Sequence, residues 1–181
     1  MKIVSMNIRG FGGPTKQKAL KEMFSSLNPD IILLQETMCD HITALRLFVY
    51  MKSGWEFCAI DALGLSGGIL SAYNPILIRC KSYNSFVGIL LTACFKGLDY
   101  VFSIVNCYGP YANRTSYWNS IVAGGIFNYP NLILVVDLNF TISNLEIWGD
   151  CARMDHLSLY FAQLLESMHM VDLSPTKIGP T

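Results

Sequence analysis

Acidic, amide and phenolic side chains follow four apolar runs of this sequence, at the points where buried strands would end. Such residues come after positions 2–6 (Asn7), 31–34 (Gln35 and Glu36), 101–105 (Asn106 and Tyr108) and 132–136 (Asp137 and Asn139). Polar groups at the ends of buried strands gather at one rim of a sheet, where binding and catalytic residues are commonly found. The ordered set therefore predicts a shared site that cleaves phosphodiesters.

The acidic members of this set suit the charged steps of that chemistry. Phosphodiester cleavage needs a cation, a group that orients water, and donors to the developing charge. Glu36 is predicted to bind Mg²⁺, which usually takes one or two protein carboxylates, and Asp137 is predicted to orient the water. Asn139 would assist beside Asp137 if the strand continues. A solvated acid at position 36 and an Asx turn at position 139 are the structural alternatives.

The neutral members can contact a phosphate without repelling it. Asn7 offers an amide and Tyr108 a phenolic hydroxyl, and both groups form hydrogen bonds with anions. Taken singly, Asn7 before a glycine-rich turn is a typical turn former, and Tyr108 before Gly109-Pro110 is a typical loop aromatic. The functional interpretation therefore depends on the order of the whole set.

Composition limits the class of protein more than it identifies a partner. The 181 residues suit one domain over 1–181, and thirteen basic residues balance thirteen acidic ones, although Lys16, Lys18 and Lys21 form a local basic cluster. Mean hydropathy is high, at +0.37. The longest nearly unbroken apolar run, 87–95, is about half of the ~18 residues that a membrane-spanning helix needs. Strands covered on both faces, or surface left open by a missing segment, would explain the apolarity.

Cysteine usage and the N-terminus favour an intracellular protein. The six cysteines form no close pair such as CxxC and lie mostly in apolar stretches, so we expect reduced core residues rather than a zinc site or disulfides. The N-terminal segment lacks the apolar block of a signal peptide because Asn7 and Arg9 interrupt it. No transmembrane segment is expected.

The hydrophobic pattern predicts one mixed α/β unit. Helices are expected over residues 15–27, with Thr15 as the cap and Asn28 near the end, around 45–49, over 115–127 and over 157–168. Strands are expected over 2–6, 31–34, 55–60, 69–73, 76–79, 86–95, 100–107 and 132–136, and those between 55 and 107 are expected to form antiparallel hairpins.

These motifs together resemble the endonuclease/exonuclease/phosphatase superfamily, which has the fold of deoxyribonuclease I and the apurinic endonucleases. Within it, the sequence is most similar to endonuclease domains of plant LINE-type retrotransposons. The matching stretches cover nearly the whole chain: Ser5 to Gly10, Pro29 to Thr37, Gly64 to Gly68, Asn106 to Pro110, and Asp137 to Asn139.

The resemblance implies a two-sheet α/β sandwich with outer helices and a Mg²⁺-dependent phosphodiesterase site acting on DNA, with Mn²⁺ as a second usable metal and the nucleus as one location. It implies that Glu36 binds the metal, and that Asn7 contributes to metal binding and contacts the metal-bound phosphate region. It implies further that Tyr108 contacts the phosphate, Asp137 orients water and Asn139 assists.

Several positions depart from the family pattern. Met6 stands where the family usually has tryptophan, and Val136 replaces a glycine that commonly precedes the aspartate. The Ser-Asp-His motif that completes the family site does not follow Leu173. We therefore expect a C-terminally truncated copy with a bare sheet edge, lacking its last strands, and with weak or no activity.

Other histidines do not replace the missing motif. His156, in Met154-Asp155-His156, precedes an amphipathic segment, and Asp155 suits the first turn of that helix. His41 and His169 have no motif around them. Two alternatives to a DNA-cleaving domain stay open: a non-catalytic remnant of a retrotransposon, and a phosphatase acting on another phosphate ester.

Overall fold

The computed structural model describes residues 1–64, 66–85, 87–142 and 155–173. The chain divides into two compact units. The first comprises Met1–Gly109 and Asn128–Asp137, and the second comprises Pro110–Phe127 and Leu138–Thr181. The sequence predicted one domain over 1–181. A division into compact units does not test whether they fold as one domain, so this stays a prediction.

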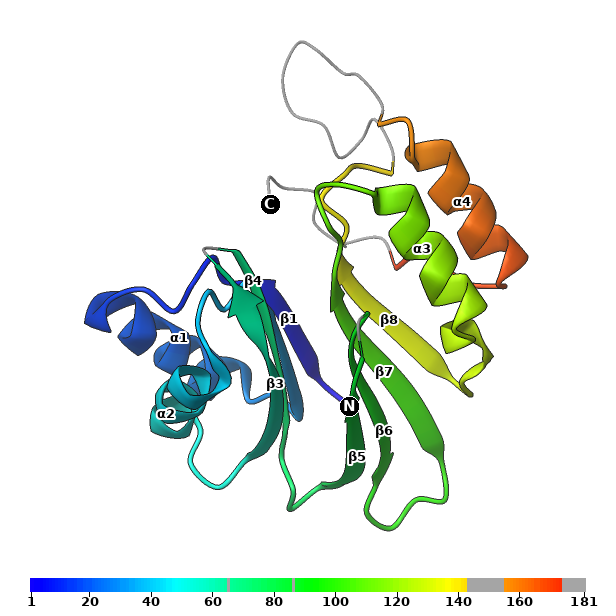
Figure 1. Ribbon diagram of the computed structural model, residues 1–181. Coiled ribbons are helices and arrows are strands. Elements are labelled where there is room, and N and C mark those ends of the chain that lie inside the picture. The colour runs from blue at the N-terminus through cyan, green and yellow to red at the C-terminus, as the bar shows by residue number, and fades with distance from the viewer. Residues whose placement is uncertain (65, 86, 143–154, 174–181) are drawn as a thin grey trace. The chain divides into compact units, whose positions relative to one another are not determined.

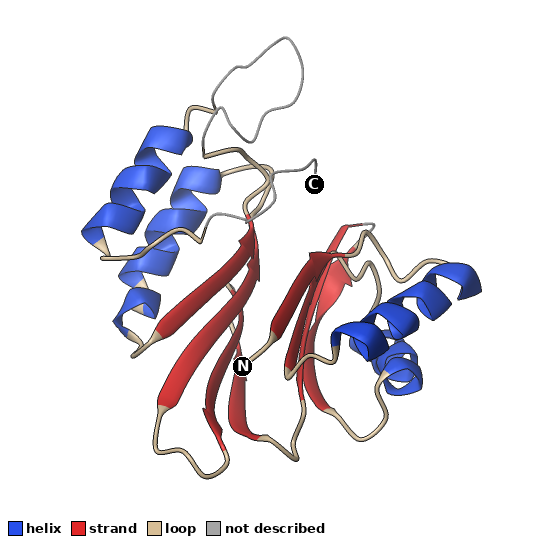
Figure 2. Ribbon diagram, turned by 180° about the vertical axis from the view of Figure 1, so that it is seen from behind, coloured by secondary structure: helices blue, strands red, loops and turns tan. Residues whose placement is uncertain are grey.

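The first unit contains two four-stranded sheets and two helices (Figures 1 and 2). One sheet has the order β1-β2-β4-β3 and the other the order β5-β6-β7-β8. The strands of the first sheet are β1 (Ile3–Asn7), β2 (Ile31–Gln35), β3 (Glu56–Leu63) and β4 (Ser66–Tyr73). Those of the second are β5 (Ile78–Asn84), β6 (Gly88–Phe95), β7 (Val101–Tyr108) and β8 (Leu132–Asp137).

The pairing confirms the predicted hairpins. Strands β3 and β4, β5 and β6, and β6 and β7 are antiparallel neighbours, whereas β1 with β2 and β7 with β8 are parallel. Parallel pairing places Asn7 beside Gln35 and Tyr108 beside Asp137. The polar residues that follow these strands are therefore neighbours within each sheet.

Helices α1 (Pro14–Leu27) and α2 (His41–Met51) cover the outer face of the first sheet. Their buried residues pack with alternate positions of β2 and β4 into one core: Leu20, Phe24, Ala44, Phe48, Met51, Ile32, Leu34, Leu70 and Ala72. Helix α1 starts at Pro14 with Gly13 before it and no side-chain cap, so the expected cap by Thr15 is wrong. Asn28 does end this helix, in the left-handed conformation.

A second apolar core lies between the two sheets. It takes the other alternate positions, among them Ile31 and Leu33 of β2, Ile89 and Leu91 of β6, and Ile104 of β7. Strand β2 is consequently buried along its whole length, as expected of a strand covered on both faces. The edge strand β8 is partly exposed at every residue.

The second unit holds α3 (Arg114–Ala123) and α4 (Ser158–Ser167), with a 3₁₀ turn at Ile126–Asn128 on its boundary. The fully buried ring of Trp118 packs edge-on against Phe161, with ring centres 4.7 Å apart. The Tyr160 hydroxyl donates to Asn119 Oδ1 at 2.7 Å. Helix α3 is shorter than the predicted 115–127, because the chain turns at Gly124-Gly125.

The described cysteines form no disulfide, and Cys151 lies outside the described residues. Cys107 is fully buried, but Cys39, Cys58, Cys80 and Cys94 are only partly so, which is less burial than predicted. Burial raises the pKa of the Cys80 thiol to about 12, and the nearby Glu56 adds to the effect. The thiol therefore stays protonated at neutral pH. None of the described helices combines the length and apolarity that crossing a membrane requires.

Candidate active site at the carboxyl ends of β1, β2, β7 and β8

Four of the five predicted site residues lie in the first unit and meet in two pairs, each joining one sheet to the other. Asn7 Nδ2, at the end of β1, donates to Asp137 Oδ2, at the end of β8, at 2.6 Å. The Tyr108 hydroxyl, at the end of β7, donates to Glu36 Oε1, just after β2, at 2.6 Å. Because Asn7 neighbours Gln35 and Tyr108 neighbours Asp137 in their sheets, the two pairs lie at the same end of the sandwich.

The alternation of the strands explains why Asn7, Tyr108 and Asp137 face inward. Ile3 in β1, Ile104 in β7 and Ile133 in β8 pack in the core between the sheets. Successive inward positions lie two residues apart, so the inward row of each strand ends at the site residue. The interior thus changes from apolar to polar toward this rim.

Glu36 does not follow that alternation, because the chain turns at this residue. Gln35 already occupies the inward position at the end of β2, and Glu36 has a left-handed backbone with φ 51°. The turn is held by two backbone hydrogen bonds: Gly10 N–H donates to the Glu36 carbonyl at 2.6 Å, and Thr37 N–H donates to the Gly68 carbonyl at 3.1 Å. This conformation is uncommon for a residue with a side chain, and such outliers cluster at functional sites.

Gly68 allows this turn because its lack of a side chain lets Thr37 approach its backbone closely. A Cβ at Gly68 would lie 2.3 Å from Thr37 Oγ1, and its φ of +80° is one that other residues rarely adopt. Gly67, at φ +79°, has nothing within 4 Å of an added Cβ. The Ser66-Gly67-Gly68 part of the recognised motif therefore shapes the loop that carries Glu36, and Leu65 lies outside the described residues.

The Glu36 carboxylate is deeply buried yet has no cationic partner among the described residues. The residue is 5% exposed, and the Tyr108 hydroxyl is the hydrogen-bond donor that it meets. An ionised carboxylate in such a place is costly unless it is paired, hydrogen-bonded or bound to a metal. With the Asp137 carboxylate at the same rim, the site offers carboxylate oxygens, which are the donors that Mg²⁺ prefers. The residues present therefore fit a magnesium ion.

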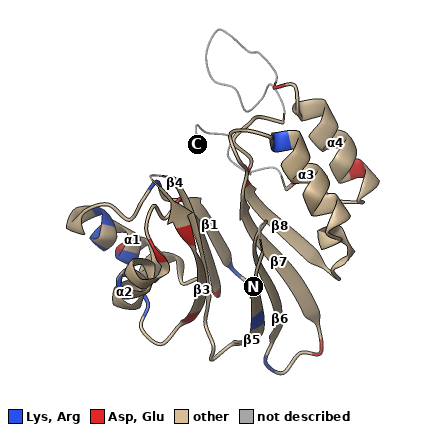
Figure 3. Ribbon diagram, viewed as in Figure 1, with Lys and Arg blue, Asp and Glu red and all other residues tan. Residues whose placement is uncertain are grey.

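That fit rests on two carboxylates and not on a larger cluster. Within the described residues, no group of three or more His, Cys, Asp or Glu side chains could hold a metal. Magnesium binds to proteins through one or two carboxylates and keeps several waters, so two acids are enough. The strands around the site carry little other charge: β6 and β7 have no charged residue, whereas Lys and Arg are prominent on α1 (Figure 3).

Asn7 is also the turn former that the alternative interpretation expected. Its Oδ1 accepts the backbone N–H of Arg9 at 3.0 Å, while its Nδ2 donates to Asp137. If the amide were flipped, its NH₂ group would face the Arg9 N–H and its oxygen would face the Asp137 carboxylate. The two partners therefore fix its orientation. With Oδ1 already engaged, Asn7 is better suited to orient Asp137 than to bind the metal as a principal ligand.

Asn139 belongs to the second unit, and its predicted role is not tested. The strand does not continue to it, because β8 ends at Asp137 and Asn139 has φ 55°, so strand alternation does not place its side chain beside Asp137. Its carbonyl oxygen lies 3.5 Å from Arg114 Nη1 in the same unit.

Asp155 has a structural role, as expected, but it lies before α4 and not in the first turn of that helix, where the sequence had placed it. Its carboxylate accepts the Leu157 N–H at 2.9 Å and Arg114 Nη1 at 2.8 Å, just before α4. Burial raises the pKa of Asp155, but these two interactions outweigh it, and the pKa lies below its ordinary value. His156 is largely exposed beside it, and Met154 lies outside the described residues.

Two further polar residues of the site region were not predicted. Gln35 and Asn106 are almost completely buried, and Gln35 Nε2 donates to Asn106 Oδ1 at 2.6 Å across the two sheets. Both stood in the polar clusters of the sequence, and strand alternation would have pointed them inward.

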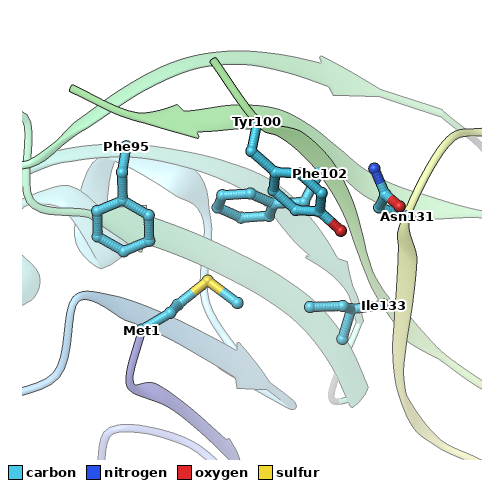
Figure 4. A pocket seen from close by; sticks show the side chains of 6 residues that line it. All are labelled: Met1, Phe95, Tyr100, Phe102, Asn131 and Ile133. Atoms are coloured by element: carbon cyan, nitrogen blue, oxygen red, sulfur yellow. The ribbon is translucent and has the colours of Figure 1, made fainter. Parts of the chain in front are cut away.

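Another cavity in the first unit is chemically unlike this rim. About 410 Å³ in volume, it is lined by Met1, Phe95, Tyr100, Phe102, Asn131 and Ile133 (Figure 4). These residues stand at or before the starts of β1, β7 and β8 or at the end of β6, so the cavity lies at the other end of the strands from Asn7 and Asp137. It contains no carboxylate or cationic side chain.

The fold is that of the endonuclease/exonuclease/phosphatase superfamily, the deoxyribonuclease I-like sandwich, and its structural neighbours are members of that superfamily. No protein-family profile matches the sequence, and no curated protein matches it. The likeness therefore comes from solved structures, at identities that establish the fold alone.

Three of these structures illustrate the likeness. The AP endonuclease LMAP from Leishmania major has a TM-score of 0.65 and 16% identity over 92% of this chain, which spans 66% of its length. The endonuclease domain of TRAS1, a telomere-specific non-LTR retrotransposon, has a TM-score of 0.61 and 16% identity, covering 92% of this chain and 70% of that one. The 3′ phosphatase NExo from Neisseria, bound to product DNA hairpin, has a TM-score of 0.58 and 14% identity, covering 93% of this chain and 71% of that one.

Proposed function

We propose that the protein is a Mg²⁺-dependent phosphodiester hydrolase domain of the endonuclease type that acts on DNA. The observation that carries this proposal is the pair of contacts between the sheets, Asn7 with Asp137 and Tyr108 with Glu36, at one rim of the sandwich. They gather two carboxylates, an amide and a phenol, which are the groups that the chemistry requires.

In this proposal each side chain has a distinct task. Glu36, with Asn7 as a weaker contributor, would hold the metal, which supplies charge neutralisation at the phosphate oxygens. The Tyr108 hydroxyl orients the Glu36 carboxylate and lies where a phosphate oxygen would approach it. Asp137 accepts a proton from the attacking water, and the Asn7 amide fixes the carboxylate for that step. Asn139 is proposed to assist Asp137, as the resemblance implies.

The proposed activity of this chain alone is weak. Its 181 residues contain no Ser-Asp-His motif, and the resemblance assigns to that motif the acid/base histidine. Removing one member of a cooperating catalytic set commonly removes most of the rate. The similarity to TRAS1 supports an origin in a LINE-type retrotransposon and a nuclear site of action, and Mn²⁺ is proposed to replace Mg²⁺.

Two other functions use the same geometry. A non-catalytic remnant would keep the fold and the metal site without turnover, and the departures Met6 and Val136 favour it. Met6 packs against the core beneath α1 and α2, and Val136 in β8 pairs with the buried Cys107 in β7. A phosphatase acting on another phosphate ester is supported by the similarity to the 3′ phosphatase NExo.

Nicking of supercoiled plasmid tests the proposal. We expect slow nicking that requires Mg²⁺ and stops with chelator, and Asp137→Asn should lower its rate at least about 100-fold because a general base contributes that much. The matched control is Asp99→Asn, an exposed acid in the turn between β6 and β7. Nicking that persists in Asp137→Asn would refute the assignment. No nicking by the unaltered protein, with Mg²⁺ still bound, would favour the remnant.

A further inference from the structure

A layer of uncharged polar side chains lies between the apolar core and the candidate site. It consists of Ser5 in β1, Gln35 in β2, Ser71 in β4 and Asn106 in β7, and is called the polar layer below. Gln35, Ser71 and Asn106 are at most 2% exposed. Ser5, Gln35 and Asn106 stand next to or two residues from a site residue, and Ser71 stands three residues after Gly68 in the motif that shapes the site.

Three hydrogen bonds of the polar layer join Asn106 of the second sheet to the first sheet, and a fourth lies within the first sheet. Gln35 Nε2 donates to Ser5 Oγ at 3.2 Å and to Asn106 Oδ1 at 2.6 Å. Asn106 Nδ2 donates to the Leu70 carbonyl and to Ser71 Oγ, both at 3.0 Å. A backbone carbonyl can only accept, so the Asn106 amide has one permitted orientation, and Oδ1 must face Gln35.

This network fixes where the two sheets stand relative to each other near the rim. Apolar contacts are non-directional, so the core alone would permit small shifts of one sheet over the other. The bond between Gln35 and Asn106 is directional and lies one or two residues from Glu36 and Tyr108. A shift of that separation would lengthen the 2.6 Å contact between Tyr108 and Glu36.

We propose that the polar layer is a positioning device, and that Gln35 and Asn106 are positioning residues that hold Glu36 against Tyr108 and Asn7 against Asp137. The inference rests on the proposed function for its consequence in catalysis. Its structural content, that breaking the polar layer loosens the pairs at the rim while leaving the fold in place, can be measured separately.

The first test is the double variant Gln35→Met with Asn106→Leu, which replaces both amides by apolar groups of similar size. Replacing both partners of a buried hydrogen bond in this way can be nearly neutral for stability. The variant also removes the donors to Ser5 Oγ, Ser71 Oγ and the Leu70 carbonyl, so we expect a somewhat lower urea midpoint than that of the unaltered protein. Under conditions in which both proteins are folded, Mg²⁺ affinity should be reduced about 10- to 100-fold, the usual effect of losing groups that orient metal ligands. A purely structural layer would leave the Mg²⁺ affinity of the folded protein unchanged, and that result would overturn the proposal.

Milder variants keep the test valid if the double variant does not fold. Ser71→Ala removes one acceptor of Asn106 and should weaken Mg²⁺ binding in the same direction by a smaller factor. The matched control is Ser103→Ala, because Ser103 lies on β7 with Asn106 and its Oγ is fully buried with no hydrogen-bond partner in the described part of the chain. Equal Mg²⁺ affinities for Ser71→Ala and Ser103→Ala would contradict the proposal.

A readout that needs neither metal nor activity separates this inference from the proposed function. One of the two protons of the Asn7 side-chain NH₂ group is donated to Asp137, and its NMR signal should be shifted from that of a solvated amide. In the variants of the polar layer this signal should move toward the position of a solvated amide, whereas Ser103→Ala should leave it unchanged. If the unaltered protein neither binds Mg²⁺ nor nicks DNA, the proposed function fails, but movement of this signal still supports positioning. An unmoved signal refutes it.

Discussion

Removing the Tyr108 hydroxyl should destabilise the protein through the Glu36 carboxylate. In Tyr108→Phe the ring keeps its packing, but the buried carboxylate loses the donor at 2.6 Å. Hydrogen bonds to charged groups contribute about 1.5–3 kcal/mol, so the free energy of unfolding should fall by about 2 kcal/mol at neutral pH. With a urea m-value of about 2 kcal/mol/M for a chain of this size, the midpoint should drop by about 1 M.

The same variant reports on the metal. Because a cation at Glu36 would compensate for the lost donor, the deficit of Tyr108→Phe should shrink when saturating Mg²⁺ is present. Urea unfolding followed by circular dichroism, with Mg²⁺ and with chelator, measures both quantities. Tyr83→Phe is the control, because Tyr83 is 52% exposed on β5 and should change stability by less than about 0.5 kcal/mol. Equal midpoints for the two variants would show that the Glu36 carboxylate does not depend on Tyr108.

Two further predictions concern the loop that carries Glu36 and the second unit. Gly68→Ala should destabilise the protein more than Gly67→Ala in urea unfolding, because both replace glycine at a similar φ but only the first sets a Cβ against Thr37; equal losses would argue against the close approach. Asp155→Asn should lower stability at pH 7. Because the folded pKa of Asp155 is depressed, the stabilisation is present above about pH 4 and is lost as the pH falls through the folded pKa, so the two proteins should converge in acid; a difference that is constant with pH would contradict this.

Much of the fold follows from local pattern. Continuous apolar runs predicted the buried strand β2, and short runs separated by turn residues predicted the antiparallel hairpins. Element ends were less predictable: β5 starts at Ile78 and continues to Asn84, beyond the predicted 76–79, because its later residues are polar and mostly exposed on an edge strand. Polar edge residues carry little strand signal.

The sequence can indicate which polar residues end at this rim, but not the geometry in which they meet. Asn7, Tyr108 and Asp137 end inward-facing rows, which strand alternation can indicate from sequence. Glu36 reaches the same rim only through a left-handed turn, and that turn depends on Gly10 and Gly68, far apart in the sequence. Contacts of this kind are tertiary, so no local pattern reveals them.

Magnesium binding at Glu36 is the most direct test of the account, measured by calorimetry on the purified protein. Glu36→Gln keeps the size of the side chain and removes its charge, and it should weaken Mg²⁺ binding at least about 10-fold. Glu22→Gln, on the exposed face of α1 beside Lys18, should bind Mg²⁺ as the unaltered protein does. Equal affinities in all three proteins would contradict a metal site at this rim.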